Sequence, residues 1–257
     1  MKLEPEIYNI YPIAWIAKSK VLMDYVYSVL VKERTTEHDK EFLVADFASG
    51  EHDRVPSFFL RILPELLTSD EGPKKRTTVY STDLHALRLD SLMGKLEESS
   101  LLEDVRVVLA KLETMDEDAH LRPDMLEYLE ANLSSNTWLD THLKEQKFIP
   151  PNTFDIGVLN NDIVGYLQEY YTEYSNAIMG LQKVHKVLKD GALLVVTMPC
   201  SLYVIDNVQI LESLGFEFLE GQDIVLSNGS VTLLNRFTEP QTMSRLGHYT
   251  FLIFIRK

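Results

Sequence analysis

Cysteine is almost absent from this chain of 257 residues, which contains only Cys200. A single cysteine excludes an intrachain disulfide and any zinc site built from several cysteines. The histidines show no metal-binding spacing such as HExxH, so we expect no metal site. We expect Cys200 to be a small filler of the core, which is the usual place of a free cysteine.

Long hydrophobic runs are also absent. The longest, VRVVLA, GALLVV and FLIFI, fall far short of the roughly 18 apolar residues that a transmembrane helix needs. The N-terminus, MKLEPEIYNI, carries acids where a secretion signal would carry bases followed by an apolar run. The sequence therefore predicts a cytoplasmic protein without a membrane partner.

Basic residues are scarce relative to acidic ones: 25 Lys and Arg stand against 39 Asp and Glu, a formal net charge of −14. This charge repels phosphate backbones at long range, so nucleic acid is disfavoured as a partner unless a local basic groove overrides it. The hydrophobic content of 45 % is that of an ordinary globular protein, which excludes wholesale disorder, collagen and coiled coil. The oligomeric state is left open.

Short apolar segments alternate with helical patterns along most of the chain. The predicted strands cover 41–47, 77–82, 105–110, 154–160, 192–198, 216–226 and 248–257, and the predicted helices 54–67, 84–99, 166–188 and 204–215. The first five strands are nearly continuous apolar runs, which is typical of a parallel sheet covered on both faces. No long helical pattern separates the last two strands, so we expect them to form an antiparallel pair. The fold class is therefore α/β, a doubly wound, mostly parallel seven-stranded sheet with an antiparallel C-terminal strand.

Two segments lie outside this alternation. Residues 7–33 have the apolar spacing of an amphipathic helix, so we expect an N-terminal helical extension over 1–40 and a main domain over 41–257. Residues 113–152 form a 40-residue insertion with nine acids and three bases, which includes a helical pattern, PDMLEYLEANL. This insertion is longer than a crossover helix requires. Either it borders the functional site or it is an inert acidic excursion.

Carboxylates end the first two predicted strands. Asp46 closes an apolar strand and is followed by a turn of small residues, Ala48, Ser49 and Gly50, which lets the backbone approach a ligand closely. Asp83 ends the second strand, where a carboxylate can accept hydrogen bonds from both hydroxyls of a ribose. The pair predicts a nucleoside-containing ligand at the carboxyl edge of the sheet.

These residues resemble the first motifs of class I S-adenosylmethionine-dependent methyltransferases. In that family an acidic residue is followed at alternate positions by three glycines; here Asp46 and Gly50 match, whereas Ala48 and His52 replace the outer glycines. A dinucleotide-binding dehydrogenase is the nearest competitor, but its longer glycine spacing is not matched. The resemblance implies that 41–257 is a Rossmann-like domain that binds S-adenosylmethionine.

Later segments carry the same resemblance. Asp83 matches the ribose-binding acid, with Leu84 placed against the adenine, whereas Lys111 stands where an adenine-contacting aspartate is frequent, so that contact would fall to Glu113 or to the backbone. The segments 154–162 and 187–196 resemble the family's fourth-strand motif and the phrase that leads into its fifth strand. The resemblance implies the following cofactor-binding residues: Asp46, Phe47, Ala48, Gly50, Asp83, Leu84, Leu112 and Asn160.

The resemblance further implies transfer of a methyl group, with Asp162 as the catalytic base for a nucleophile that arrives protonated. The net charge favours a small-molecule or protein methyl acceptor over nucleic acid. A catalytically inactive relative that serves as an interaction or regulatory module is the alternative, because a fold does not carry function by itself. The departures at Ala48, His52 and Lys111 all fall where the cofactor is expected.

Overall fold

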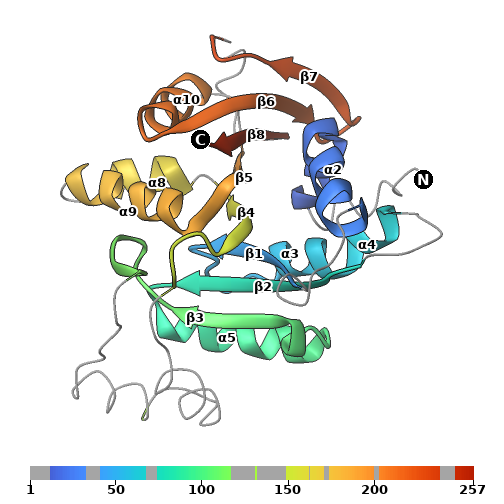
Figure 1. The fold of residues 1–257 in the computed structure, drawn as a ribbon, viewed down its shortest axis with the longest axis vertical. Helices are drawn as coiled ribbons and strands as arrows, with labels where there is room; N and C mark the ends of the chain where they lie inside the picture. Colours follow the sequence, from blue (N-terminus) through green and yellow to red (C-terminus); the bar gives the residue numbers. More distant parts are fainter. Residues whose placement is uncertain are drawn as a thin grey trace.

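A computed structural model describes residues 12–32, 41–67, 74–116, 131, 149–161, 163–170, 174–199, 203–237 and 247–257. Its centre is a sheet of eight strands: β1 (Glu41–Phe47), β2 (Arg76–Asp83), β3 (Val105–Leu109), β4 (Phe154–Leu159), β5 (Leu188–Met198), β6 (Phe216–Val225), β7 (Ser230–Leu234) and β8 (His248–Arg256). The strand order is β3-β2-β1-β4-β5-β8-β6-β7, which Figure 1 shows as a twisted central layer. Cys200, Asp162 and most of the insertion, 117–130 and 132–148, lie outside the described residues.

The first five strands are parallel and the last three are antiparallel to their neighbours. This arrangement confirms the mixed α/β sheet and the antiparallel pairing of the last two predicted strands, which are β6 and β8. The structure adds an eighth strand, β7, because the chain turns at Asn228 and Gly229 and pairs 230–234 with β6. Gly229 has a φ of +68°, a conformation that glycine adopts without strain.

Helical segments cover both faces of the sheet. One layer contains η1 (Pro12–Lys18), α2 (Lys20–Tyr27), η2 (Ser28–Lys32), α3 (Arg54–Ser57), η3 (Phe58–Ile62), α4 (Leu63–Leu66) and α5 (Ala86–Glu98). The other contains η5 (Leu112–Thr114), α8 (Ile163–Tyr170), α9 (Tyr174–Val187) and α10 (Val204–Ser213), and the short η4 (Leu102–Asp104) leads into β3. Figure 1 shows α2, α3 and α4 on the opposite side of the sheet from α8, α9 and α10. None of the helices among the described residues is both long and apolar enough to cross a membrane.

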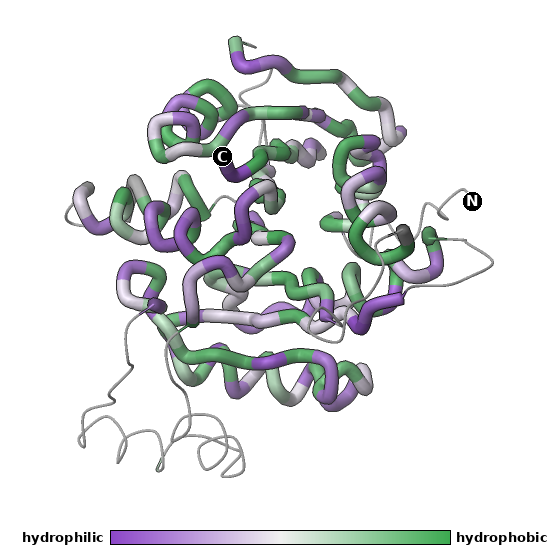
Figure 2. The backbone as a smooth tube through the Cα atoms, viewed as in Figure 1, coloured by the Kyte–Doolittle hydropathy of each residue, from purple (hydrophilic) through white to green (hydrophobic). Residues whose placement is uncertain are grey.

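Successive side chains of a strand point to opposite faces of the sheet and pack in two separate hydrophobic cores. Along β5, Leu193 and Val195 pack in the core shared with η1, α2 and α5, whereas Leu194 and Val196 pack in the core shared with α9 and α10. This alternation follows from the two-residue period of a strand. In Figure 2 β3 is mainly hydrophobic, while α5 alternates between hydrophilic and hydrophobic residues, as expected of a helix with one face on the sheet.

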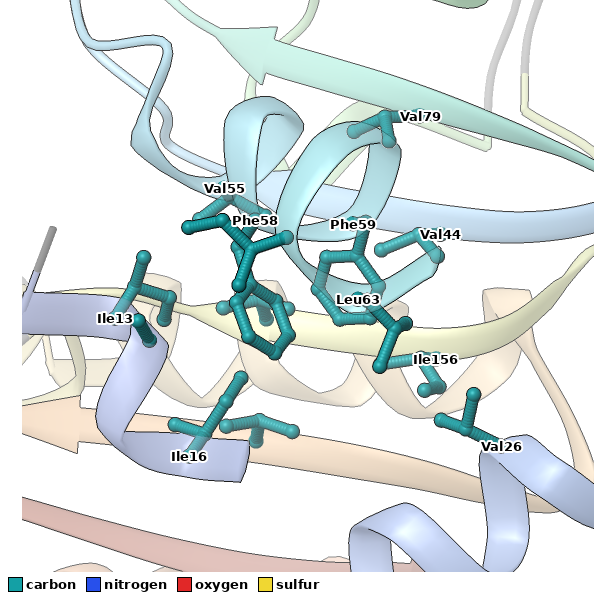
Figure 3. Packing of buried hydrophobic residues seen from close by; sticks show 14 of the residues in the cluster. Ile13, Ile16, Val26, Val44, Val55, Phe58, Phe59, Leu63, Val79 and Ile156 are labelled. Carbon is teal, nitrogen blue, oxygen red and sulfur yellow. The ribbon is translucent and has the colours of Figure 1, made fainter. Parts of the chain in front are cut away.

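The N-terminal segment shares the first of these cores. Figure 3 shows Ile13 and Ile16 lying near Phe58, and Phe59 and Leu63 lying near the strand residues Val44 and Ile156. The expected continuous helix over 7–33 is interrupted at Ser19, which caps α2 by accepting a hydrogen bond from the backbone N–H of Leu22 at 3.0 Å. Residues 12–32 therefore pack as part of the main body.

Candidate functional site

The turn after β1 is held in a left-handed conformation at two positions. Ala48 and Gly50 have φ values of 54° and 63°. Gly50 adopts this conformation freely, whereas Ala48 carries a Cβ that makes it costly by about 1–2 kcal/mol. The backbone N–H of Ser49 donates to the carbonyl oxygen of Thr82 at 2.8 Å, so the turn is tied to β2. The small residues of the predicted motif therefore serve this turn.

Asp83 joins the ends of β1 and β2. Its Oδ2 accepts a hydrogen bond from the backbone N–H of Gly50 at 2.9 Å, and its Oδ1 accepts one from the backbone N–H of His85 at 2.8 Å. The side chain is buried, with 5 % of its surface exposed. Because a carboxylate has about four acceptor positions, two remain for a ligand.

Asp46 is more deeply buried, with 2 % of its surface exposed. Burial, and then repulsion from the negative charge of Asp83, raise the pKa of Asp46 well above its ordinary value. Among the described residues, no Lys or Arg forms an ion pair with Asp46. A positively charged ligand beside it would favour the ionised carboxylate.

A cavity of about 380 Å³, which we call the large cavity, opens beside these two carboxylates. It lies where the strand order reverses between β1 and β4, the point at which doubly wound sheets bind ligands. Seven of the eight predicted cofactor-binding residues line it: Asp46, Ala48, Gly50, Asp83, Leu84, Leu112 and Asn160. Leu84 is 47 % exposed there, and the buried hydroxyl of Ser49, which also lines the cavity, has no hydrogen-bond partner among the described residues.

Phe47, the eighth predicted residue, does not line the large cavity. Its side chain is fully buried on the other face of the sheet, where it packs edge-on against Phe154 with ring centroids 6.0 Å apart. The two-residue period of β1 explains this, since Phe47 points away from the side on which Asp46 lies. Only the backbone of Phe47 remains for a ligand.

Two of the three departures from the motifs, His52 and Lys111, leave the large cavity open. His52 lines it from a largely exposed position, and partial desolvation, followed by the charges of Arg54 and Lys95, lowers its pKa. Lys111 does not line the cavity, although Ala110 and Leu112 on either side of it do. Neither residue fills the large cavity.

The end of β4 is fixed by the neighbouring strand. The hydroxyl of Thr197 on β5 donates to Oδ1 of Asn160 at 2.7 Å and accepts from the backbone N–H of Asn161 at 2.8 Å. Asn161 has a φ of 67°, which asparagine tolerates better than most residues. Thr197 was not predicted as a site residue, although a lone polar residue near the end of an apolar strand could have indicated it.

A second, small cavity of about 220 Å³ meets the large one at this place. Arg54, Asn160 and Asn161 line both cavities. The small cavity is also lined by Pro12, Ile13, Pro199, Leu226, Gly247, His248 and Tyr249. No sequence motif joins these residues, because they come from four distant parts of the chain. Asp162, the predicted base, lies outside the described residues.

Comparisons with known proteins give a likeness of fold at low sequence identity. No family model and no curated protein matches the chain. It is similar to a SAM dependent methyltransferase from Aquifex aeolicus, with 13% identity, 100% of both chains covered and a TM-score of 0.48. It is similar to an S-adenosylmethionine-dependent methyltransferase from Clostridium acetobutylicum ATCC 824, with 11% identity, 98% of both chains covered and a TM-score of 0.48. It is also similar to the cyclase SpnF, with 12% identity, 92% of this chain and 80% of that chain covered and a TM-score of 0.49.

Proposed function

We propose that this protein is an S-adenosylmethionine-dependent methyltransferase. The observation that carries the proposal is the pair of buried carboxylates, Asp46 and Asp83, at the ends of neighbouring strands and facing one cavity at the switch point of the sheet. A neutral ligand would gain little from a buried acid whose pKa is raised, whereas a sulfonium amino acid carries positive charge to it. The ribose of the same molecule has two hydroxyls for Asp83.

Different residues that line the large cavity would bind different parts of the cofactor. Asp83 accepts the ribose hydroxyls through its two remaining acceptor positions, and Leu84 and Leu112 provide apolar surface for the adenine. Asp46 lies on the side of the methionine part, and the tight turn at Ala48 and Gly50 brings backbone close to it. When bound, S-adenosylmethionine supplies an electrophilic methyl group, and the protein contributes chiefly by positioning, which can supply roughly 7–11 kcal/mol.

The acceptor that we propose is a small molecule held in the small cavity. That cavity meets the large one at Asn160 and Asn161, so an acceptor there would lie beside a cofactor in the large cavity. The acidic net charge of −14 argues against nucleic acid as the acceptor. Asp162 stays a predicted base, next in sequence to Asn161.

Isothermal titration calorimetry with S-adenosylmethionine tests the proposal. We expect saturable binding to the wild type and an affinity lower by roughly 100-fold or more for Asp83→Asn, because hydrogen bonds to a charged acceptor are worth about 1.5–3 kcal/mol each. Asp206→Asn, an exposed acid on α10, is the matched control and should bind as the wild type does. No heat from folded wild type would refute the cofactor assignment, and binding of NAD instead would identify a dinucleotide site.

A further inference from the structure

Three polar side chains meet on one face of the antiparallel pair β6–β8. Asp223 on β6 is directly opposite Thr250 on β8, and His248 lies two residues before Thr250, so all three side chains share a face. Oδ1 of Asp223 accepts a hydrogen bond from the hydroxyl of Thr250 at 2.6 Å, and Oδ2 lies 2.9 Å from Nδ1 of His248. Asp223 and Thr250 are buried, and His248 is partly buried.

This arrangement fixes the proton on His248. An ionised carboxylate only accepts hydrogen bonds, so Nδ1 must carry the hydrogen that it donates to Asp223. In the neutral ring Nε2 then carries no hydrogen, so Nε2 is the atom that can accept a proton. Among the described residues Nε2 has no hydrogen-bond partner, and His248 lines the small cavity.

The chemistry of the small cavity limits what it can hold. Its described lining has apolar surface from Ile13, Leu226 and Pro199, and Arg54 is its one permanently charged side chain. No carboxylate is among those lining residues, so an ammonium group would find no counter-ion there. The volume of about 220 Å³ is below the range of about 300–1,000 Å³ of drug-sized ligand pockets, which suits a compact molecule.

We propose that His248 is the general base for a small, uncharged acceptor that presents a hydroxyl group, such as a phenol, and that Asp223 is the residue that positions it. This inference rests on the proposed methyltransferase function. The hydroxyl proton moves to Nε2 of His248, and the acceptor oxygen forms its bond to the methyl carbon. The carbon–sulfur bond breaks with its electron pair left on sulfur, so a sulfonium becomes a neutral thioether and the histidine becomes an imidazolium. Asp223 stabilises that imidazolium, and Arg54 faces the oxygen as it loses its proton.

Nuclear magnetic resonance on protein labelled with ¹⁵N-histidine tests the site without any turnover. The resonances of His248 are assigned by their loss in His248→Asn. In the neutral ring we expect Nε2 to be the nitrogen without a hydrogen, and we expect saturable binding of phenol to move its resonance toward the protonated position. Anisole, which has the same ring but no hydroxyl hydrogen, should leave it unmoved. A proton on Nε2 in the free protein, or no response to phenol, would overturn the proposal.

The positioning role of Asp223 has its own readout. In Asp223→Asn the amide can also donate to Nδ1, so we expect the proton to shift toward Nε2 and the phenol response to be lost. Thr232→Val is the matched control, because Thr232 is paired with Asp223 on the other side but is exposed. An unchanged tautomer in Asp223→Asn would show that this carboxylate does not position the ring.

Methyl transfer to a panel of phenols separates a failure of this inference from a failure of the proposed function. We expect His248→Asn to bind S-adenosylmethionine with the affinity of the wild type but to transfer at a rate lower by roughly 100-fold or more, the usual contribution of a general base. An unchanged rate in His248→Asn, with a loss in Asp162→Asn, would assign the base to Asp162 and overturn the proposal. Absence of cofactor binding to the wild type would refute the methyltransferase, while the phenol titration still decides whether the hydroxyl site exists.

Discussion

Asp46 and Asp223 are both buried carboxylates, one lining the large cavity and the other bonded to His248 of the small cavity, but their surroundings differ. Asp223 receives hydrogen bonds from Thr250 and His248, so its charge is satisfied within the protein. Asp46 faces the negative charge of Asp83 and forms no ion pair among the described residues, so its charged form is penalised. A buried acid whose charge is stabilised by protein donors holds its neighbours in place, whereas one whose charge is destabilised gains most from a positively charged ligand. The difference separates a positioning group from a binding group.

The largest expected effects follow from replacing each of these two acids with asparagine. Asp46→Asn should weaken binding of S-adenosylmethionine by about 10-fold or more, since a charged partner for the positive charge is lost, yet it should stabilise the free protein near neutral pH, because the penalty on the buried charge is removed. Asp223→Asn should destabilise the protein by about 1–3 kcal/mol, because a charged acceptor of two hydrogen bonds is lost. Thermal unfolding measures both changes, and roughly 2–4 °C per kcal/mol is expected at this chain length. Melting temperatures that fell in both variants would contradict the distinction between the two acids.

The sign of the Asp46 effect depends on pH. Its folded pKa lies above the ordinary value of 3.8, so over the interval between the two values the folded state holds more protons than the unfolded state. The free energy of unfolding therefore falls as pH rises through that interval, and it stops falling above the folded pKa. The gain from Asp46→Asn should vanish below pH 3.8 and be greatest above the raised pKa, which unfolding at a series of pH values measures.

The features that the sequence predicted well are those set by local pattern. Asp46 and Asp83 each end an apolar segment, and parallel pairing of β1 with β2 places such ends at one edge, so both reach the large cavity. The alternation of side chains along β1 also predicts that Phe47 points away from Asp46, into the core on the other face. The side chains of Asp223 and His248 meet only through the register of β6 with β8, which joins Val225 to His248. A hairpin pattern in the sequence predicts that two strands pair, but it does not give their register.

A smaller effect is expected where the two cavities meet. Thr197→Val removes the hydroxyl that holds Asn160 and the backbone of Asn161, at a cost of about 1–2 kcal/mol in the free energy of unfolding. Because both asparagines line both cavities, the affinities for S-adenosylmethionine and for phenol should fall together. Thr250→Val is the matched control, since within the described part of the chain the hydroxyl of Thr250 bonds only to Asp223, and it should weaken only phenol binding. If Thr197→Val lowered the affinity for only one of the two ligands, the end of β4 would not form part of both binding sites.

The smallest expected effect is at Ala48, in the turn that leads from Asp46 into the large cavity. Its φ of 54° costs an alanine about 1–2 kcal/mol, whereas glycine avoids that cost but loses about 0.5–1 kcal/mol through the greater freedom of the unfolded chain. Ala48→Gly should therefore stabilise the protein by about 0.5–1 kcal/mol and leave cofactor affinity equal or higher. Gly50→Ala is the reverse experiment: a methyl group there would meet no atom within 4 Å, so the φ of +63° alone should make this variant less stable by a similar amount. Because each change adds or removes one methyl group in the same turn, melting temperatures that moved in the same direction would show that backbone strain does not decide the residue at these positions.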